Sequence, residues 1–330
     1  MGDIIAPDGS PLSVAVISVA NMNKSIHFYR DLIGLTTHEK VTWSGHDFEE
    51  LWNLPEGTSA EAVFCELTGC PVGRILLLDF SAKDKQVIRS DETYRAYGLF
   101  NLNFYTDDIH GDSEKLKGKG FKFWSEPTHY KMSGTQGAPT EVIFNGPDGV
   151  AINLVELTGN DPKTRVGQMH AYVKEHGRTP TGFTPVVTTS HVAHDLDKAV
   201  AFYETILKSG VLIDEILGGP EQNNFLGLPK NAKTAVKFMQ GNHMFGKIAL
   251  SCPINYDCED LVQYAHAPNI GYLAQMFEVT DLDYCVEGCN ELGAEEYAPR
   301  GQHVVPGLGL IDTFTVRNPG SGALQIIFRA

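Results

Sequence analysis

Residues 19–29 read Val-Ala-Asn-Met-Asn-Lys-Ser-Ile-His-Phe-Tyr, and residues 193–203 repeat the pattern as Ala-His-Asp-Leu-Asp-Lys-Ala-Val-Ala-Phe-Tyr. The closing tyrosines, Tyr29 and Tyr203, are 174 positions apart, and the Leu-Pro pairs that follow keep the same interval. A period of this length, with each copy of ordinary domain size, indicates a tandem duplication of a domain rather than a solenoid.

Each copy contains two similar units of its own. In the first copy, a strand pattern over residues 99–105 leads into Thr-Asp-Asp-Ile and a charged helical stretch, and Asp108 lies 87 positions after Asn21. In the second copy, Asp281 lies 86 positions after Asp195 in a similar setting. Each unit has the pattern of a strand, a capped helix and further strands. We therefore predict four units of one kind.

Local signals divide the 330 residues into two domains. Residues 12–20 have the composition of a strand, and the helix after them begins at an Asn or Asp cap and carries the Phe-Tyr pair on its buried face. Residues 161–184 contain Pro, Gly and Thr clusters that are typical of a linker. We predict an N-terminal domain over residues 1–160, this linker, and a C-terminal domain over residues 185–330.

Composition excludes several classes of function. The net charge is −15, from 26 basic and 41 acidic residues, and a nucleic-acid partner would need a basic face. No apolar run reaches the roughly 18 to 20 residues that span a bilayer, and the amino terminus lacks a basic-then-apolar signal. We expect a cytoplasmic protein without a membrane partner. Its six cysteines, which include no Cys-x-x-Cys pair, are expected to be reduced thiols.

The order of these elements resembles a known family. A strand, a capped helix carrying Phe-Tyr, three strands and a closing turn, as in residues 145–149 and 317–322, resemble the vicinal oxygen chelate superfamily. This group includes glyoxalases, bleomycin-resistance proteins and type I extradiol dioxygenases. The resemblance implies an α+β fold of two tandem domains, each made of two βαβββ modules that form a half-open barrel. Four modules in one chain look most like the extradiol arrangement.

The likeness is closest in the final unit. Gly301-Gln302-His303 and the later Phe314-Thr315 and Asn318-Pro319 resemble the extradiol signature, which ends on a metal-binding Glu. Two departures matter here. The spacing from His303 to Phe314 is longer than in the signature, and the place of the Glu is taken by Gln325.

The resemblance also implies where a metal would be held, namely on the first and last strands of each module. The first-strand position is seven residues before the helix cap and falls on Val14, Asn101, Thr188 and Ala274. The last-strand position falls on Asn153 and Gln325, and near Leu77 and Leu250. Fe(II) or Mn(II) sites use imidazoles and carboxylates, which none of these positions supplies. We expect no metal and no other cofactor, although an out-of-register His191 or His243 would restore a ligand.

Strand alternation predicts which side chains face each barrel's interior. In the first half these are Val14, Val16, Ser18, Asn101, Asn103, Tyr105, Asn153 and Val155, and in the second Thr188, Ser190, Val192, Ala274, Met276, Glu278, Gln325, Ile327 and Arg329. From these faces and the extradiol signature, the predicted substrate-binding residues are Asn101, Asn103, Asn153, Thr188, Ser190, Met276, Gln325 and Phe314. The predicted catalytic residues are His303, Tyr105, Glu278 and His129, with Tyr130 and Asp312 as further acid–base candidates.

Apolar walls with convergent amides and hydroxyls favour a small organic ligand. We expect an enzyme that acts on an aromatic or oxygenated hydrophobic metabolite by metal-independent acid–base chemistry of the lyase, isomerase or hydratase type. Two alternatives stay open: a metal-dependent extradiol-type dioxygenase or glyoxalase, and a non-catalytic ligand-binding resistance protein. A homodimer is one expected assembly, and the sequence leaves open whether the tandem halves already supply that pairing and which half is active.

Overall fold

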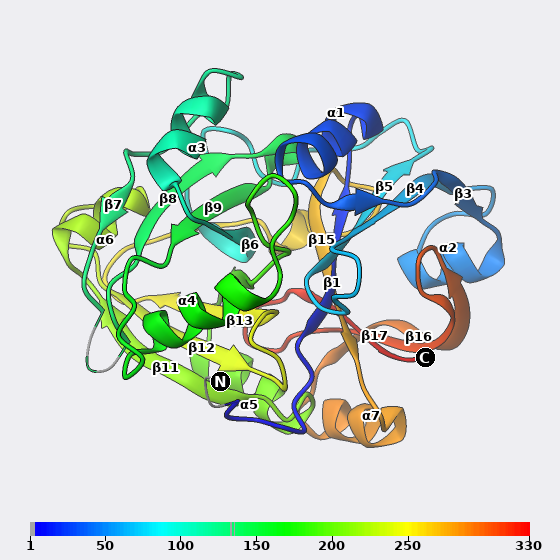
Figure 1. Ribbon diagram of the computed structural model, residues 1–330. Helices are drawn as coiled ribbons and strands as arrows, with labels where there is room; N and C mark the ends of the chain where they lie inside the picture. Colours follow the sequence, from blue (N-terminus) through cyan, green and yellow to red (C-terminus); the bar gives the residue numbers. More distant parts are fainter. Residues whose placement is uncertain (1–3, 133, 135) are drawn as a thin grey trace.

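The computed structural model describes residues 4–132, 134 and 136–330 and contains two mixed β-sheets of nine strands each. The first sheet has the order β16-β17-β18-β15-β1-β5-β4-β2, with β3 paired to β4, and lies on the right of Figure 1. Its strands are β1 (Leu12–Ser18), β2 (Thr36–Thr37), β3 (Val41–Ser44), β4 (Ser59–Glu66), β5 (Arg74–Phe80), β15 (Gly271–Glu278), β16 (Glu295–Val305), β17 (Gly309–Arg317) and β18 (Leu324–Arg329).

The second sheet has the order β11-β12-β13-β10-β6-β9-β8-β7, with β14 paired to β6. Its strands are β6 (Ala96–Thr106), β7 (Thr128–His129), β8 (Thr140–Asn145), β9 (Ala151–Glu156), β10 (Thr188–Val192), β11 (Gly210–Leu217), β12 (Thr234–Gln240), β13 (Lys247–Pro253) and β14 (Glu259–Asp260). The helices are α1 (Met22–Ile26), which continues as a π-helical segment over His27–Leu32, α2 (His46–Trp52), α3 (Ile109–Lys117), α4 (Arg165–Glu175), α5 (Leu196–Thr205), α6 (Pro220–Phe225) and α7 (Leu282–Glu291). Short 3-10 turns occupy Pro147–Gly149 and Val262–Tyr264.

Four βαβββ modules follow one another along the chain. Module 1 holds α1 and β1 to β5, module 2 holds α3 and β6 to β9, module 3 holds α5 and β10 to β13, and module 4 holds α7 and β15 to β18. The predicted α+β fold of two half-open barrels, each built from two such modules, is confirmed. No helix in the described part of the chain is long and apolar enough to cross a bilayer.

The modules that share a barrel differ from our expectation. Strand β1 runs antiparallel to β15, with Val14 opposite Met276, and β6 runs antiparallel to β10, with Asn103 opposite Thr188. One barrel therefore joins modules 1 and 4, and the other joins modules 2 and 3. The expectation that modules 1 and 2 line one cavity, and modules 3 and 4 another, is wrong. The first strands of the four modules have similar edges. The sequence repeat therefore does not predict which first strands pair with one another.

The predicted helix caps are confirmed in all four modules. Each side chain accepts a hydrogen bond from the backbone N–H three residues later, at 2.9 to 3.1 Å: Asn21 from Lys24, Asp108 from Gly111, Asp195 from Lys198, and Asp281 from Tyr284. Such a cap contributes about 1 kcal/mol to helix stability. The caps fix where each helix leaves its first strand and therefore which helix face meets the sheet.

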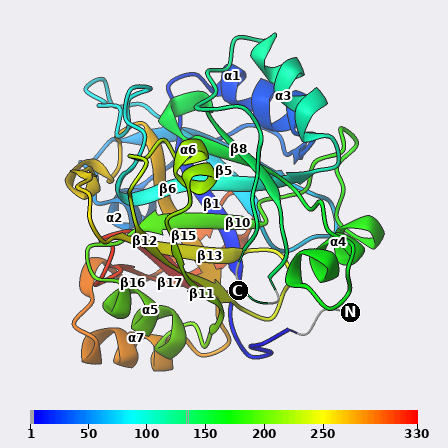
Figure 2. The same cartoon turned by 90° about the vertical axis from the view of Figure 1, so that its left-hand side faces the viewer.

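The main core lies between the two sheets, where their convex faces and the four module helices meet. Figures 1 and 2 both show α1 beside α3 and α5 beside α7. The ring centroids of Phe28 and Phe121 are 5.3 Å apart, and the Tyr284 hydroxyl donates to the Thr205 carbonyl at 2.9 Å. The Phe-Tyr pairs lie inside this core, as their helical spacing predicted.

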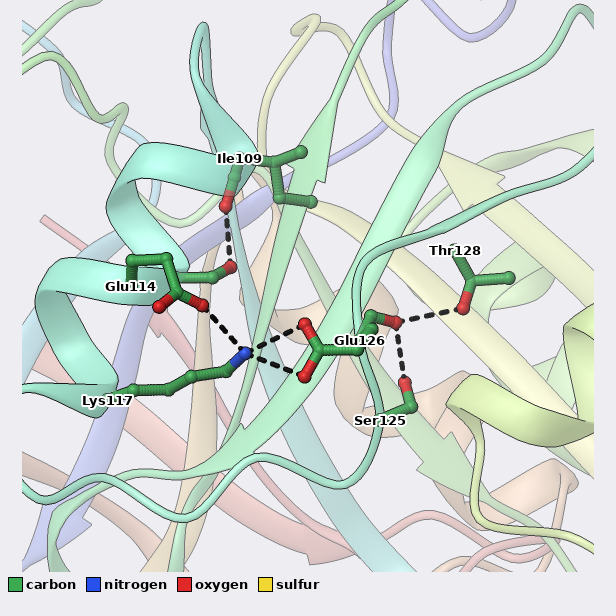
Figure 3. A network of polar contacts seen from close by, with 7 residues as sticks. Ile109, Glu114, Lys117, Ser125, Glu126 and Thr128 are labelled. Carbon is green, nitrogen blue, oxygen red and sulfur yellow. Dashed lines mark hydrogen bonds and ion pairs between the residues drawn. The ribbon is translucent and has the colours of Figure 1, made fainter.

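An exposed ion-pair network fastens the end of α3 to the segment that leads into β7 (Figure 3). The Lys117 ammonium lies 3.0 Å from Glu114 and 2.8 Å from both carboxylate oxygens of Glu126. These hydrogen bonds raise the pKa of Lys117, with Glu126 as the larger cause. The Ser125 and Thr128 hydroxyls donate to the Glu126 carbonyl, each at 3.0 Å, so the turn is ordered locally before the chain reaches the second sheet.

Candidate active site

Side chains fill the interior of the barrel of modules 1 and 4. Most of its concave strand residues are apolar, and they pack against the aromatic rings of Trp43, Phe48 and Trp52 from α2 and the strand before it. The buried polar side chains of His303 and Thr313 lie on the same strand faces as Val305 and Ile311. The Tyr297 hydroxyl donates to the Trp52 carbonyl at 3.0 Å and holds this cluster of aromatic rings against β16. Met276, predicted to bind substrate, is therefore part of a packed core.

The barrel of modules 2 and 3 encloses a cavity of about 120 Å³. Strands β6, β8, β9, β10, β11, β12 and β13 line it, together with residues of α4 and α6. Its walls are largely apolar and include Phe100, Ile143, Val155, Phe225, Val236 and Phe238. Polar and charged side chains converge between these walls, and such a mixture is the usual composition of a small-molecule site.

One row of polar side chains crosses the cavity floor from strand to strand. Lys247 on β13 is in register with Thr188 on β10, Thr188 with Asn103 on β6, and Asn103 with Asn153 on β9. All four line the cavity. Neighbouring strands are about 4.8 Å apart, so the row extends over roughly 14 Å from Lys247 to Asn153. A ligand lying along the floor meets an amine at one end and amides towards the other.

A carboxyl group lies beside the amide end of this row. Glu141 on β8 accepts a hydrogen bond from the Tyr130 hydroxyl at 2.7 Å on one oxygen and from the Asn153 amide at 2.7 Å on the other. Burial raises the pKa of Glu141, while the Asn153 and Tyr130 hydrogen bonds act in the opposite direction. A carboxyl held by neutral donors in apolar surroundings can take up and release a proton closer to neutrality than an exposed one.

Lys247 carries the second titratable group of the cavity. Its side chain is 2% exposed, its ammonium donates to the Met244 carbonyl, and its nitrogen lies 5.9 Å from the centroid of the Tyr105 ring. Burial lowers the pKa of Lys247 to about 7. Near neutral pH the free amine is therefore a far larger fraction of the population than at an exposed lysine.

Tyr105 is close to Lys247, and the charge of Glu141 also acts on its hydroxyl. Its hydroxyl donates to Met169 Sδ at 3.1 Å, and burial, with a smaller contribution from the charge of Glu141, raises its pKa. The side-chain oxygens of Asn103 and Asn153 are buried and have no hydrogen-bond partner among the described residues. An unpaired buried amide oxygen costs about 1 to 3 kcal/mol, so these two atoms favour a donor group from outside the protein.

Arg95 adds a second cation at the cavity wall. Its guanidinium donates to Ser251 Oγ at 2.6 Å and lies 4.8 Å from the centroid of the Phe100 ring. The Nε of Arg95 is buried and has no hydrogen-bond partner within the described ranges. The wall therefore offers a positively charged donor to an oxygen-bearing ligand.

The structure brings six of the predicted site residues together. Tyr105 and five of the predicted substrate-binding residues line this one cavity, although they come from both halves of the chain: Asn101, Asn103, Asn153, Thr188 and Ser190. The Ser190 hydroxyl donates to Asn101 Oδ1, so these two partly satisfy one another. Tyr130, an additional acid–base candidate, lies in the same cavity.

Gln325 lies on the opposite face from the one we expected. Leu324 and Ile326 point into the barrel of modules 1 and 4, whereas Gln325 points into the core between the sheets. There it accepts from the Tyr203 hydroxyl at 3.2 Å and donates to Gln275 at 3.2 Å. The alternation that we expected along β18 was wrong by one residue. A shift of one residue moves a side chain to the other face of a sheet.

The four other predicted residues lie away from this cavity. Phe314 is part of the core between the sheets, and Glu278 is exposed at the end of β15. His129 is exposed on β7, with its Nδ1 3.1 Å from the Thr140 hydroxyl. His303 is buried on β16 of the other barrel, and neither ring nitrogen has a hydrogen-bond partner among the described residues. Asp312 is bound to Arg300 at 2.8 Å.

Sequence reasoning missed Lys247, Glu141 and Arg95. A signal for Lys247 was present in residues 247–253, which read Lys-Ile-Ala-Leu-Ser-Cys-Pro. Strand alternation places Lys247 on the same face as Ala249 and Ser251, and all three line the cavity. We had placed the last-strand position near Leu250, which lies in the core on the other face. Glu141 is likewise in phase with Ile143 on β8.

The cavity residues do not fit the divalent metal that the fold implies. The lining contains two carboxylates, Glu141 and Glu215, and neither histidine nor cysteine. No group of three His, Cys, Asp or Glu residues in the described part of the chain is arranged to hold a metal ion. Lys247 and Arg95 place cationic groups where a divalent ion would need anionic ones.

Neither of the two out-of-register histidines supplies a ligand to the cavity. A register shift follows Ser190, and His191 lies in the core between the sheets, bonded to Ser321 at 2.9 Å and Gln275 at 2.7 Å. His243 accepts a hydrogen bond from the Phe245 N–H at 2.9 Å within its own loop. We therefore derive no step through a metal.

The fold and cavity define a class of protein: paired half-open barrels built from four βαβββ modules, with a small-molecule cavity in one of them. Residues 12–154 match the family model described as the Glyoxalase/Bleomycin resistance protein/Dioxygenase superfamily. This match covers modules 1 and 2, and it agrees with the resemblance of the sequence pattern to the vicinal oxygen chelate superfamily. No curated protein sequence matches the chain significantly.

Solved structures share the fold over nearly the whole chain. Glyoxalase I from Zea mays is similar with a TM-score of 0.60 and 16% identity, covering 97% of this chain and 92% of that one. A protein from Bacillus subtilis subsp. subtilis str. 168, described as a candidate dioxygenase, has a TM-score of 0.56 and 13% identity, covering 98% and 86%. At these identities the likeness concerns the fold alone.

Proposed function

We propose that this chain is an enzyme that binds a small, partly apolar, oxygen-bearing molecule in the cavity of modules 2 and 3 and acts on it by acid–base chemistry without a resident metal. The observation that carries the proposal is the pair of titratable groups, Lys247 and Glu141, in one apolar cavity. Each is held by neutral partners, and burial moves the pKa of both towards neutrality.

The two groups suit a proton transfer of the lyase, isomerase or hydratase type. Such reactions need one group that removes a proton and another that donates one or stabilises developing negative charge. The Glu141 carboxylate serves as the base, with Tyr130 and Asn153 fixing its orientation. The Lys247 ammonium serves as the partner for developing negative charge. The aromatic walls support a substrate with an aromatic or other hydrophobic body.

Ligand binding to this cavity can be tested with a cavity-filling variant. Saturation-transfer NMR against a panel of small phenols, aldehydes and carboxylic acids is expected to give signals with the wild-type chain. Ala249 lines the cavity, so Ala249→Leu is expected to remove those signals. Ala235 lies on the neighbouring strand β12 and does not line the cavity, so Ala235→Leu is the matched control. Signals that survive Ala249→Leu would place the ligand elsewhere and refute the proposed site.

Chemistry is tested on a ligand found in this way. Glu141→Gln keeps the hydrogen-bonding shape but removes the base, so turnover is expected to fall by about 10² or more while binding persists. Bound ligand with no conversion by the wild-type chain would instead support the ligand-binding alternative. An activity that disappears after dialysis against a chelator and returns with one equivalent of a divalent ion would contradict the metal-independent step.

A further inference from the structure

An uncharged carbonyl holds the ammonium of Lys247, which has no carboxylate partner among the described residues. Its nitrogen donates to the Met244 carbonyl, and the ion pairs among the described residues do not include it. The side chain lines the cavity floor, in register with Thr188. A lysine without an anionic partner, in contact with a ligand cavity, has the setting of an amine nucleophile.

We propose that Lys247 captures its substrate covalently, as an imine, and that the substrate class is an aldehyde or ketone with a hydroxyl-bearing apolar body. This inference rests on the proposed function, because it needs the cavity to bind a small molecule. It goes further by naming the reactive carbonyl and the atom of the protein that bonds to it.

The step balances without an added reagent. The neutral amine of Lys247 adds to the carbonyl carbon, so that one C–N bond forms and the carbonyl π electrons move to oxygen, which takes up the proton that the nitrogen releases. The resulting carbinolamine loses that oxygen as water, with a second proton taken from solvent, and leaves a protonated imine. No electron is gained or lost overall, and hydrolysis reverses the step. Burial, which lowers the pKa of Lys247 to about 7, provides the free amine that the first addition needs.

The remaining polar groups identify the rest of the substrate. The unpaired side-chain oxygens of Asn103 and Asn153 accept hydrogen bonds, so they select hydroxyl groups rather than further carbonyls. They lie in the floor row beyond Thr188, at increasing distance from Lys247. A molecule with a carbonyl at one end and a hydroxyl at the other, joined by an apolar ring or chain, matches this order of groups.

Reductive trapping tests the inference on the full-length chain. Incubation with 4-hydroxybenzaldehyde and cyanoborohydride at about pH 7, followed by peptide mass mapping, is expected to give at least about tenfold more adduct on Lys247 than on the exposed Lys119. Lys247→Met, which keeps the length of the side chain, is expected to abolish this adduct and leave surface labelling unchanged.

Binding of the same aldehyde without reductant separates the two proposals. If it binds in the cavity, as judged by loss of binding in Ala249→Leu, but labels Lys247 no faster than Lys119, the imine is refuted and the proposed site stands. If it neither binds nor labels Lys247 selectively, the imine is refuted, and the panel binding experiment alone decides on the site. Selective labelling of Lys247 that persists in Ala249→Leu would also overturn the inference, because the amine would then react outside the cavity.

Discussion

Replacing Lys247 by methionine should change how the stability of the chain depends on pH. In the folded protein burial lowers the pKa of Lys247 to about 7, whereas the unfolded chain has the ordinary value of 10.5. Between these values the unfolded state binds more protons than the folded state, so stability is fully present above about pH 10.5 and is lost as the pH falls towards 7. At about 1.36 kcal/mol per pKa unit, the whole loss approaches about 5 kcal/mol.

The accessible part of this range is large enough to measure. From about pH 9 to about pH 6 the wild-type chain should lose about 3 kcal/mol of unfolding free energy relative to Lys247→Met. Urea unfolding at several pH values gives this difference directly, and Lys119→Met, at an exposed site, controls for loss of a lysine. Parallel curves for the wild type and Lys247→Met over that range would show that the amine is solvated, and would remove the basis for its reactivity.

Three further perturbations test other parts of the structure. Burial lowers the pKa of His191 to about 4 from 6.5, so the wild type should lose about 3 kcal/mol relative to His191→Asn as the pH falls from about 6.5 to 4, measured by urea unfolding. In Gly320→Ala the new Cβ would lie 2.2 Å from the backbone nitrogen of Ala199, so we expect a loss above about 3 kcal/mol; a thermal midpoint within a few degrees of wild type would contradict this contact. Asp195→Ala removes the cap of α5 and should cost about 1 kcal/mol, with no pH dependence above about pH 6; an unchanged denaturation midpoint would argue against the cap.

The features that sequence reasoning predicted are local. The helix caps depend on an Asn or Asp and on the next three residues, and the buried Phe-Tyr pairs depend on helical spacing within one element. The floor residues Asn103 and Thr188 were placed on concave faces because strand alternation is also local. These properties do not depend on which module pairs with which.

The features that sequence reasoning missed depend on contacts over long distances. An error of one residue in the phase of β18 placed Gln325 on the wrong face of the sheet. The filling of one barrel depends on α2, whose Phe48 and Trp52 enter an interior formed by strands from both ends of the chain. The importance of Lys247 emerges only when β13 is known to border a cavity, because a lysine in a strand is otherwise taken as exposed.

The crossed pairing of modules has a consequence for how the chain assembles. Each barrel takes one module from each half, and residues 161–184 run between them, with Thr179 and Thr181 donating to the Ile33 carbonyl, each at 2.6 Å. A fragment that ends before this segment presents two unsatisfied strand edges, β1 and β6, and cannot close either barrel alone. Two chains that exchanged their second halves would rebuild both barrels with every strand pairing intact, so a swapped dimer and a monomer of this protein differ only in the path of one connecting segment.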